Sequence, residues 1–201
     1  MQKLIWLTLL CALLVCSSVF AQDHLLITEF AVDPSSSTAV GEFIEIFNPT
    51  TETIDLTNYY LTDATFSGGG TFYYQIVEGG GGGGAFGDWH ARFPADAMIA
   101  PGEFQTISLP GSIDFMGQYI GVEPTYELYE DDAAADGIPD MLEAFPGSIA
   151  GQGGFSAGEV LILYYWDGES DLVKDVDYVV WQDKVEAVDK TGVSIDGPDA
   201  D

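Results

Sequence analysis

The residues whose types and spacing best suit a chemical role are the acidic side chains of residues 132–143. Calcium prefers oxygen ligands, and a loop of about twelve residues with a glycine at its turn can supply them from alternate positions and a final Glu. Carboxylates, a turn glycine and a backbone carbonyl fall in that register here. The residues predicted to form this calcium site are Asp132, Asp136, Gly137, Ile138, Asp140 and Glu143.

Two features of this segment weaken the predicted site. Ala134 stands at the third position, where a carboxylate or amide is usual, and Pro139 would prevent pairing with a second loop. The sequence of this segment nevertheless resembles the acidic calcium repeats of secreted bacterial proteins, of the thrombospondin type 3 kind. We expect either a weak calcium site or a solvated acidic loop in which Pro139 begins a helix.

A second candidate is the cluster of aromatic, imidazole and guanidinium side chains at Trp89, His90 and Arg92. It is either a recognition loop for a sugar or peptide, or a loop whose Trp89 and Phe93 pack back onto the protein. The only other histidine is His24, so the cluster does not indicate a metal site or a catalytic histidine.

Catalysis is not indicated by the remaining motifs. We find no nucleophile elbow, no His-Glu-x-x-His and no cysteine beyond residue 21. Glu42 and Glu45 would lie on opposite faces of one strand, so they cannot flank a single glycosidic bond. The run Gly79 to Gly84 is predicted to be a flexible loop. No lysine follows it, so it is no phosphate cradle.

The elements that must position these residues are strands. In residues 42–48 polarity alternates, which assigns Ile44 and Ile46 to the core, and Asn48 with the following proline ends the strand. The pattern predicts further strands over residues 25–30, 54–63, 71–77, 159–166 and 172–181, with a tight hairpin turn at Asp167-Gly168. Residues 127–154 do not alternate and are predicted to be an insertion with a short helical turn around residues 139–145.

Several of these runs resemble the lamin tail domain family. The matching segments keep the family's order: Ile27-Thr28-Glu29, Phe43-Ile44-Glu45-Ile46-Phe47-Asn48, Ile54-Asp55-Leu56 followed by Leu61-Thr62-Asp63, Ala100-Pro101-Gly102-Glu103, Gly158 to Tyr164, and Val176 to Trp181. The resemblance implies an all-β, immunoglobulin-like β-sandwich with the insertion between late strands. It also implies that Glu29 and Glu45 hydrogen-bond within the sandwich rather than catalyse.

The same resemblance implies a non-catalytic binding or tethering module of a larger extracellular or cell-surface protein, with an extracellular protein or polysaccharide as its partner. The alternative is an accessory domain of a secreted metal-dependent nuclease or phosphoesterase whose catalytic part lies beyond residue 201. The chain stops in an acidic, turn-rich stretch, and we expect the natural polypeptide to continue.

The first 21 residues are predicted to be a signal peptide. Lys3 precedes an apolar run from Leu4 to Val15, and Val19-Phe20-Ala21 suits cleavage before Gln22. A retained signal anchor is less favoured, since the apolar run is shorter than the roughly 20 residues a span needs. Lipid modification of Cys16 is less favoured still, because Val15 stands where such signals have a small residue. Both cysteines lie in this segment. We therefore expect a secreted or surface protein without disulfides or a span, folded as one domain over residues 22–201.

Charge narrows the choice of partners. The chain has 33 Asp and Glu against 5 Lys and Arg, a formal net charge of −28. Nucleic-acid binding depends chiefly on Lys and Arg placed against phosphates. A surface this acidic therefore argues against direct binding of nucleic acid, and it keeps an exported protein soluble.

Overall fold

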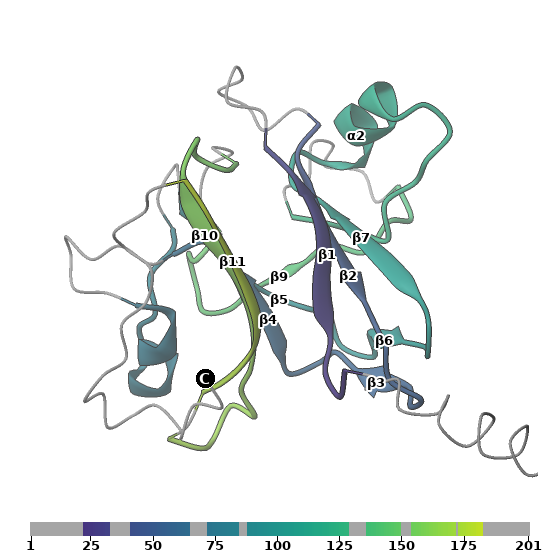
Figure 1. Ribbon diagram of the computed structural model, residues 1–201. Coiled ribbons are helices and arrows are strands. Elements are labelled where there is room, and N and C mark those ends of the chain that lie inside the picture. Colours follow the sequence, from purple (N-terminus) through teal and green to yellow (C-terminus); the bar gives the residue numbers. More distant parts are fainter. Residues whose placement is uncertain are drawn as a thin grey trace, which may run out of the picture.

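The computed structural model describes residues 22–32, 41–64, 72–84, 88–128, 136–149, 154–171 and 173–182. The predicted signal peptide and the acidic end of the chain lie outside these residues. Two main sheets stand side by side in Figure 1, and they form an immunoglobulin-like β-sandwich, as predicted.

The first sheet has the strand order β1-β2-β7-β8, and we call it sheet A. Ile44 and Ile46 are fully buried between the sheets, which confirms the predicted core face of the strand. Strand β8 pairs parallel with β7, whereas β1 with β2 and β2 with β7 pair antiparallel. The strands are β1 (Leu26–Ala31), β2 (Phe43–Phe47), β7 (Phe104–Ser108) and β8 (Tyr126–Glu127).

The second sheet, sheet C, has the order β11-β10-β4-β5-β9. The predicted hairpin of the last two strands is confirmed, because β10 and β11 pair antiparallel. The predicted turn is present at Asp167, whose carboxylate accepts hydrogen bonds from the Glu169 and Ser170 amides. It is not a tight hairpin turn, because β10 ends at Tyr165 and β11 begins at Lys174. The strands are β4 (Tyr59–Thr62), β5 (His90–Arg92), β9 (Leu142–Glu143), β10 (Glu159–Tyr165) and β11 (Lys174–Trp181).

A short ribbon lies at one end of the sandwich, where β3 (Ile54–Asp55) pairs with β6 (Met98–Ile99). The sequence predicted one strand from residue 54 to residue 63. The structure divides it into β3 and β4, because Asp55 accepts a hydrogen bond from the Thr57 amide and forms a turn between them.

The segment predicted to be an insertion with a helical turn is extended at residues 139–143 and has bends and turns at residues 144–149. The Glu127 amide donates to the Pro139 carbonyl, the Met141 amide donates to the Glu127 carbonyl, and β9 then pairs with β5. Residues 139–143 therefore cross from the edge of sheet A to the edge of sheet C. The helical prediction was wrong because these backbone groups find their partners in the two sheets rather than in a local turn.

The space between the sheets holds the main core. Its large side chains are fully buried, and they come from alternate positions of facing strands. Phe93 packs edge-on against Tyr126, with 5.4 Å between the ring centres. The buried residues include Leu25, Ile44, Ile46, Leu56, Leu61, Trp89, Phe93, Ile99, Ile107, Leu161 and Leu163.

A second core lies on the outer face of sheet C, away from sheet A. There the 3-10 helix η1 (Tyr73–Glu78), the blue coil at the left of Figure 1, packs against β4 and β10. The sequence predicted a strand over residues 71–77, an error to which short apolar runs are prone because they suit either element. The buried residues are Tyr60, Tyr73, Tyr74, Ile76, Val160, Ile162, Tyr164 and Val173.

The glycine run that follows η1 is packed at Gly81, Gly83 and Gly84, so the prediction of a flexible loop is wrong there. A Cβ at Gly83 would lie 2.8 Å from the Ser148 carbonyl oxygen and 2.9 Å from the His90 Cβ, and one at Gly84 would lie 2.3 Å from the Gly147 oxygen. The backbone has φ of +94° at Gly83 and +77° at Gly84, which glycine adopts at little cost. We call residues 79–84 the glycine strap.

Candidate binding surface

The outer face of sheet A carries an exposed aromatic stack. Phe47 and Phe104 face each other across β2 and β7 and stack with 4.3 Å between ring centres. Phe104 is 54% exposed. Beside them the Thr28 hydroxyl donates to a Glu45 carboxylate oxygen at 2.8 Å. These four residues form a continuous polar and aromatic stripe, which we call the open face.

Helix α2 (Ser112–Gln118) covers the other end of the same sheet face, as Figure 1 shows. Phe115 and Tyr119 pack edge-on against Phe43, with ring centres 6.0 and 5.5 Å away. The Tyr119 hydroxyl donates to the Gly41 carbonyl. Nothing in the sequence analysis pointed to this helix. It closes part of the sheet and leaves the stripe around Phe104 uncovered.

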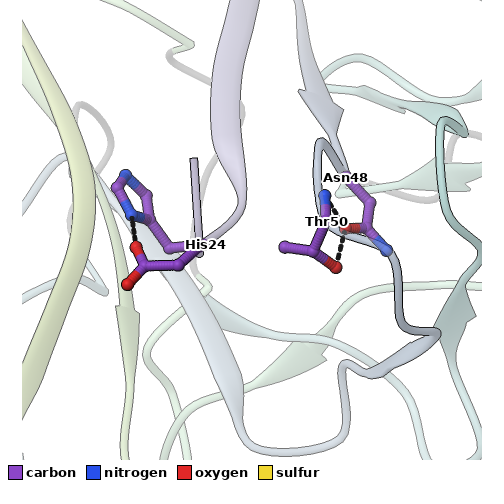
Figure 2. A network of polar contacts seen from close by, with 4 residues as sticks. His24, Asn48 and Thr50 are labelled. Carbon is purple, nitrogen blue, oxygen red and sulfur yellow. Dashed lines mark hydrogen bonds and ion pairs between the residues drawn. The ribbon is translucent and has the colours of Figure 1, made fainter. Parts of the chain in front are cut away.

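One buried residue fixes the end of β2 where the open face begins. The Asn48 amide nitrogen donates to the carbonyls of Glu52 and Ile99, while its oxygen accepts from the backbone amide and the hydroxyl of Thr50. Figure 2 shows the two bonds to Thr50. The Asn48 backbone also pairs with Gly102 and Glu103. All four hydrogen-bonding positions of the amide are used, so Asn48 joins β2, β6 and the turn before β7.

The glutamates that the sequence singled out have separate surroundings. Glu42 is buried and accepts a hydrogen bond from the Phe155 amide at 2.6 Å. Glu45 lies on the other face of β2, bonded to Thr28, as the period-two pattern predicted. Glu29 is exposed and lies opposite Glu45 in the register of β1 and β2.

The recognition-loop residues lie in sheet C. His90 and Arg92 belong to β5, and Trp89 precedes it, so the expectation of a loop is wrong here. Trp89 and His90 are buried, as is Phe93, because alternate residues face the two cores on either side of the sheet. Arg92 is half-buried and bonds to Tyr60. The inward packing of Trp89 and Phe93 that we weighed against recognition is confirmed.

The predicted calcium ligands are divided between two sheets. Asp132 lies outside the described residues, while Asp136 accepts hydrogen bonds from the Ser112 hydroxyl and the Ile138 amide. Asp140 bridges to β8 in sheet A, and Glu143 lies on β9 in sheet C. In the described part of the chain, no three His, Cys, Asp or Glu side chains are grouped to hold a metal ion.

Two buried carboxyl groups, those of Glu127 and Asp63, were not predicted from the sequence. Burial, with Asp136 and Asp140 nearby, raises the pKa of Glu127 to about 7, although the Ser112 amide donates to it. Burial and then the neighbouring Glu159 raise the pKa of Asp63 well above its usual value. Their only sequence signal is a carboxylate next to apolar strand residues, which does not distinguish buried from exposed acids.

One short serine motif precedes β10. Gly154-Phe155-Ser156-Ala157-Gly158 has the spacing of a nucleophile elbow, which the sequence analysis passed over. Such an elbow needs a strand before the serine and a helix after it. Here strand β10 follows, the Ser156 amide donates to Glu159, and its carbonyl accepts from the Trp181 indole. The motif therefore lacks the geometry of an activated serine.

None of the helices in the described residues is long and apolar enough to cross a membrane. A comparison with curated proteins gives no match. Among solved structures, the protein is similar to a DUF4876 family protein from Bacteroides thetaiotaomicron, with 19% identity and a TM-score of 0.47. That likeness covers 73% of this chain and 44% of the other, so this chain spans less than half of that protein's length.

The family model described as Lamin Tail Domain matches residues 18–192, a range that includes both sheets, the Asn48 corner and the glycine strap. The family is an immunoglobulin-like domain family without catalytic function of its own. The chain therefore belongs to the lamin tail domain family.

Proposed function

We propose that this protein is a non-catalytic, exported binding module that tethers a larger protein to an extracellular protein or polysaccharide, and that the open face of sheet A is its binding surface. One observation carries the proposal. Over β4 and β10 the outer face of sheet C is buried under η1 and the glycine strap, with Tyr178 and Val180 of β11 exposed at its edge. The outer face of sheet A keeps a half-exposed aromatic stack beside a Thr–Glu pair.

Aromatic rings next to hydrogen-bonding groups are typical of sites that bind sugars or peptides, since rings supply contact area at low entropy cost and polar groups set orientation. The chain's charge of −28 favours neutral or basic partners over anionic ones. Within the described residues, the basic side chains are Arg92, which is half-buried on β5, and Lys174 on β11. Neither belongs to the open face.

The polysaccharide form of the proposal is tested by native electrophoresis in gels that contain a soluble neutral β-glucan, xylan or mannan. Wild type should be retarded in at least one gel, and the double variant Phe47→Ser, Phe104→Ser should migrate as in a gel without polysaccharide. Met98→Ser, at an exposed apolar residue on β6, is the control and should be retarded like wild type.

The protein form is tested by placing a photo-crosslinking phenylalanine analogue at position 104 or, as control, at Tyr178 on β11. A partner should crosslink from position 104 only, and wild type should compete it away. Absence of retardation in every gel, together with no position-dependent crosslink, would contradict the proposal.

Calcium binding by Asp132, Asp136, Ile138, Asp140 and Glu143 is the finer part of the proposal. With a dissociation constant near 1 mM, typical of extracellular modules, about 10 mM calcium would stabilise the fold by roughly 1.4 kcal/mol. Thermal unfolding in calcium, magnesium or EDTA measures this. The variant Asp140→Asn should lose the calcium effect, whereas Asp114→Asn on α2 should keep it. Equal melting temperatures in calcium and EDTA would contradict calcium binding.

A further inference from the structure

His90 lies at the centre of the second core with both ring nitrogens engaged. Its Nδ1 is 3.1 Å from the Gly81 carbonyl oxygen, and its Nε2 is 2.5 Å from the Tyr164 hydroxyl. A carbonyl can only accept, so Nδ1 must carry the proton and donate it. The lone pair of Nε2 then accepts the hydroxyl proton of Tyr164. The neutral ring is thus fully bonded in one tautomer.

The backbone of the same residue shares a hydrogen-bonding partner, Ser148, with the glycine strap. The amides of His90 and Gly84 both donate to the Ser148 carbonyl at 3.0 Å, and the Ser148 hydroxyl donates to the His90 carbonyl at 2.6 Å. Gly81 and Gly83 approach the His90 ring and Cβ so closely that a side chain at either would have to displace an atom. His90 therefore bonds to the strap directly through its ring and is linked to it through Ser148 by its main chain.

We propose that His90 is an acid-sensitive latch: when its ring takes up a second proton, the glycine strap and η1 release from sheet C and expose the aromatic face beneath. The added proton sits on Nε2, where it faces the Tyr164 hydroxyl. That hydroxyl must turn to accept it and gives up its own donor bond. The charged ring is also enclosed by Tyr60, Tyr164 and Phe145 rather than water, which is costly.

The groups around His90 give little compensation for a positive charge. The titratable residues that face it are Tyr60 from β4 and Tyr164 from β10. Around them, Tyr73 from η1 donates to Asp175 of β11, and Arg92 bonds to Tyr60. Burial lowers the pKa of His90 to about 4, against smaller opposing effects of its backbone partners. Of the carboxyls on neighbouring strand positions, Asp88 lies two residues before it and Glu143 pairs opposite Ala91.

The test is hydrogen exchange of the purified protein between pH 7 and pH 3.5, corrected for the intrinsic rate at each pH. In wild type, protection of residues 72–84 should fall at least tenfold, while that of β2 stays constant. His24→Gln changes the only other histidine and should behave like wild type. His90→Gln should remove the pH dependence. An unchanged pH profile in His90→Gln would overturn the proposal.

A second measurement decides the case if His90→Gln does not fold. The chain has two histidines, so the His24→Gln protein gives a single imidazole signal by NMR. That signal should titrate with the same midpoint as the loss of strap protection. A strap that stays protected after the ring has become charged would overturn the proposal as well.

Discussion

The two outer faces of the sandwich differ in how much of each is covered by other parts of the chain. On sheet A the outward residues of β2 are Phe43, Glu45 and Phe47, and part of this face remains open. On sheet C the outward residues of β4 and β10 are buried under η1 and the glycine strap, namely Tyr60, Ile162 and Tyr164, while Tyr178 and Val180 of the edge strand β11 are exposed. Sheet C therefore contributes side chains to two cores, whereas sheet A contributes to one. Function must therefore be sought on the sheet that has only one.

The largest expected effect tests how tightly the strap closes sheet C. Gly84→Ala combines a positive φ with a Cβ placed against backbone, and we expect it to lower the free energy of unfolding by about 4 kcal/mol. Gly79→Ala has nearly the same φ but open space around its Cβ, and should cost only about 1 kcal/mol. Denaturant unfolding measures both. Equal costs would mean that the strap is not packed.

The Asn48 corner supports the open face and should give the next largest effect. Asn48→Ala removes four hydrogen bonds from a fully buried site and should cost about 3 kcal/mol. Thr50→Val removes only the hydroxyl bonds and should cost about 1 kcal/mol. The comparison uses unfolding by urea. A loss below 1 kcal/mol for Asn48→Ala would show that water replaces these partners.

The buried histidine predicts how stability depends on pH. The pKa of His90 is about 4 in the folded state and 6.5 when exposed, so the unfolded chain binds more protons between these values. The free energy of unfolding should therefore fall by roughly 3 kcal/mol as pH decreases from 6.5 to 4. Asp63 and Glu127 have raised pKa values and act in the opposite direction. The difference between wild type and His90→Gln isolates the histidine.

The smallest effect on stability is expected on the open face. Phe104 is 54% exposed, so Phe104→Ser should change the free energy of unfolding by less than about 1 kcal/mol. Tyr178→Ser, at a similarly exposed aromatic residue of β11, is a matched control for stability. Chemical denaturation of the two variants gives the values. A loss of several kcal/mol for Phe104→Ser would show that this face is a structural surface.

The sandwich could be predicted from sequence because its central strand alternates: Ile44 and Ile46 face the core, and Asn48 ends the strand. The role of Asn48 could not be derived locally, since its partners Ile99 and Gly102 lie some fifty residues away. The second core does have one signal in the sequence. Residues 160–165 of β10 are apolar without alternation, which indicates a strand buried on both faces.

The candidate site was less accessible to prediction. Stacking of Phe47 on Phe104 depends on the pairing of β2 with β7, which no local pattern specifies. The His90 cluster was visible, but its neighbours in space, Gly81 and Tyr164, come from distant strands and a glycine run. Glycine repeats predict flexibility when nothing packs on them, and the contact that orders them is tertiary.

The most direct test of this contrast is hydrogen exchange at pH 7 in the glycine strap itself. The amides of Gly79, Gly80 and Gly84 donate to the carbonyls of Ile76, Gln75 and Ser148. If the strap seals a second core, these amides should exchange at least about a hundredfold more slowly than an unstructured chain. Exchange at the unstructured rate would show that the outer face of sheet C is open, and the contrast between the two faces would fail.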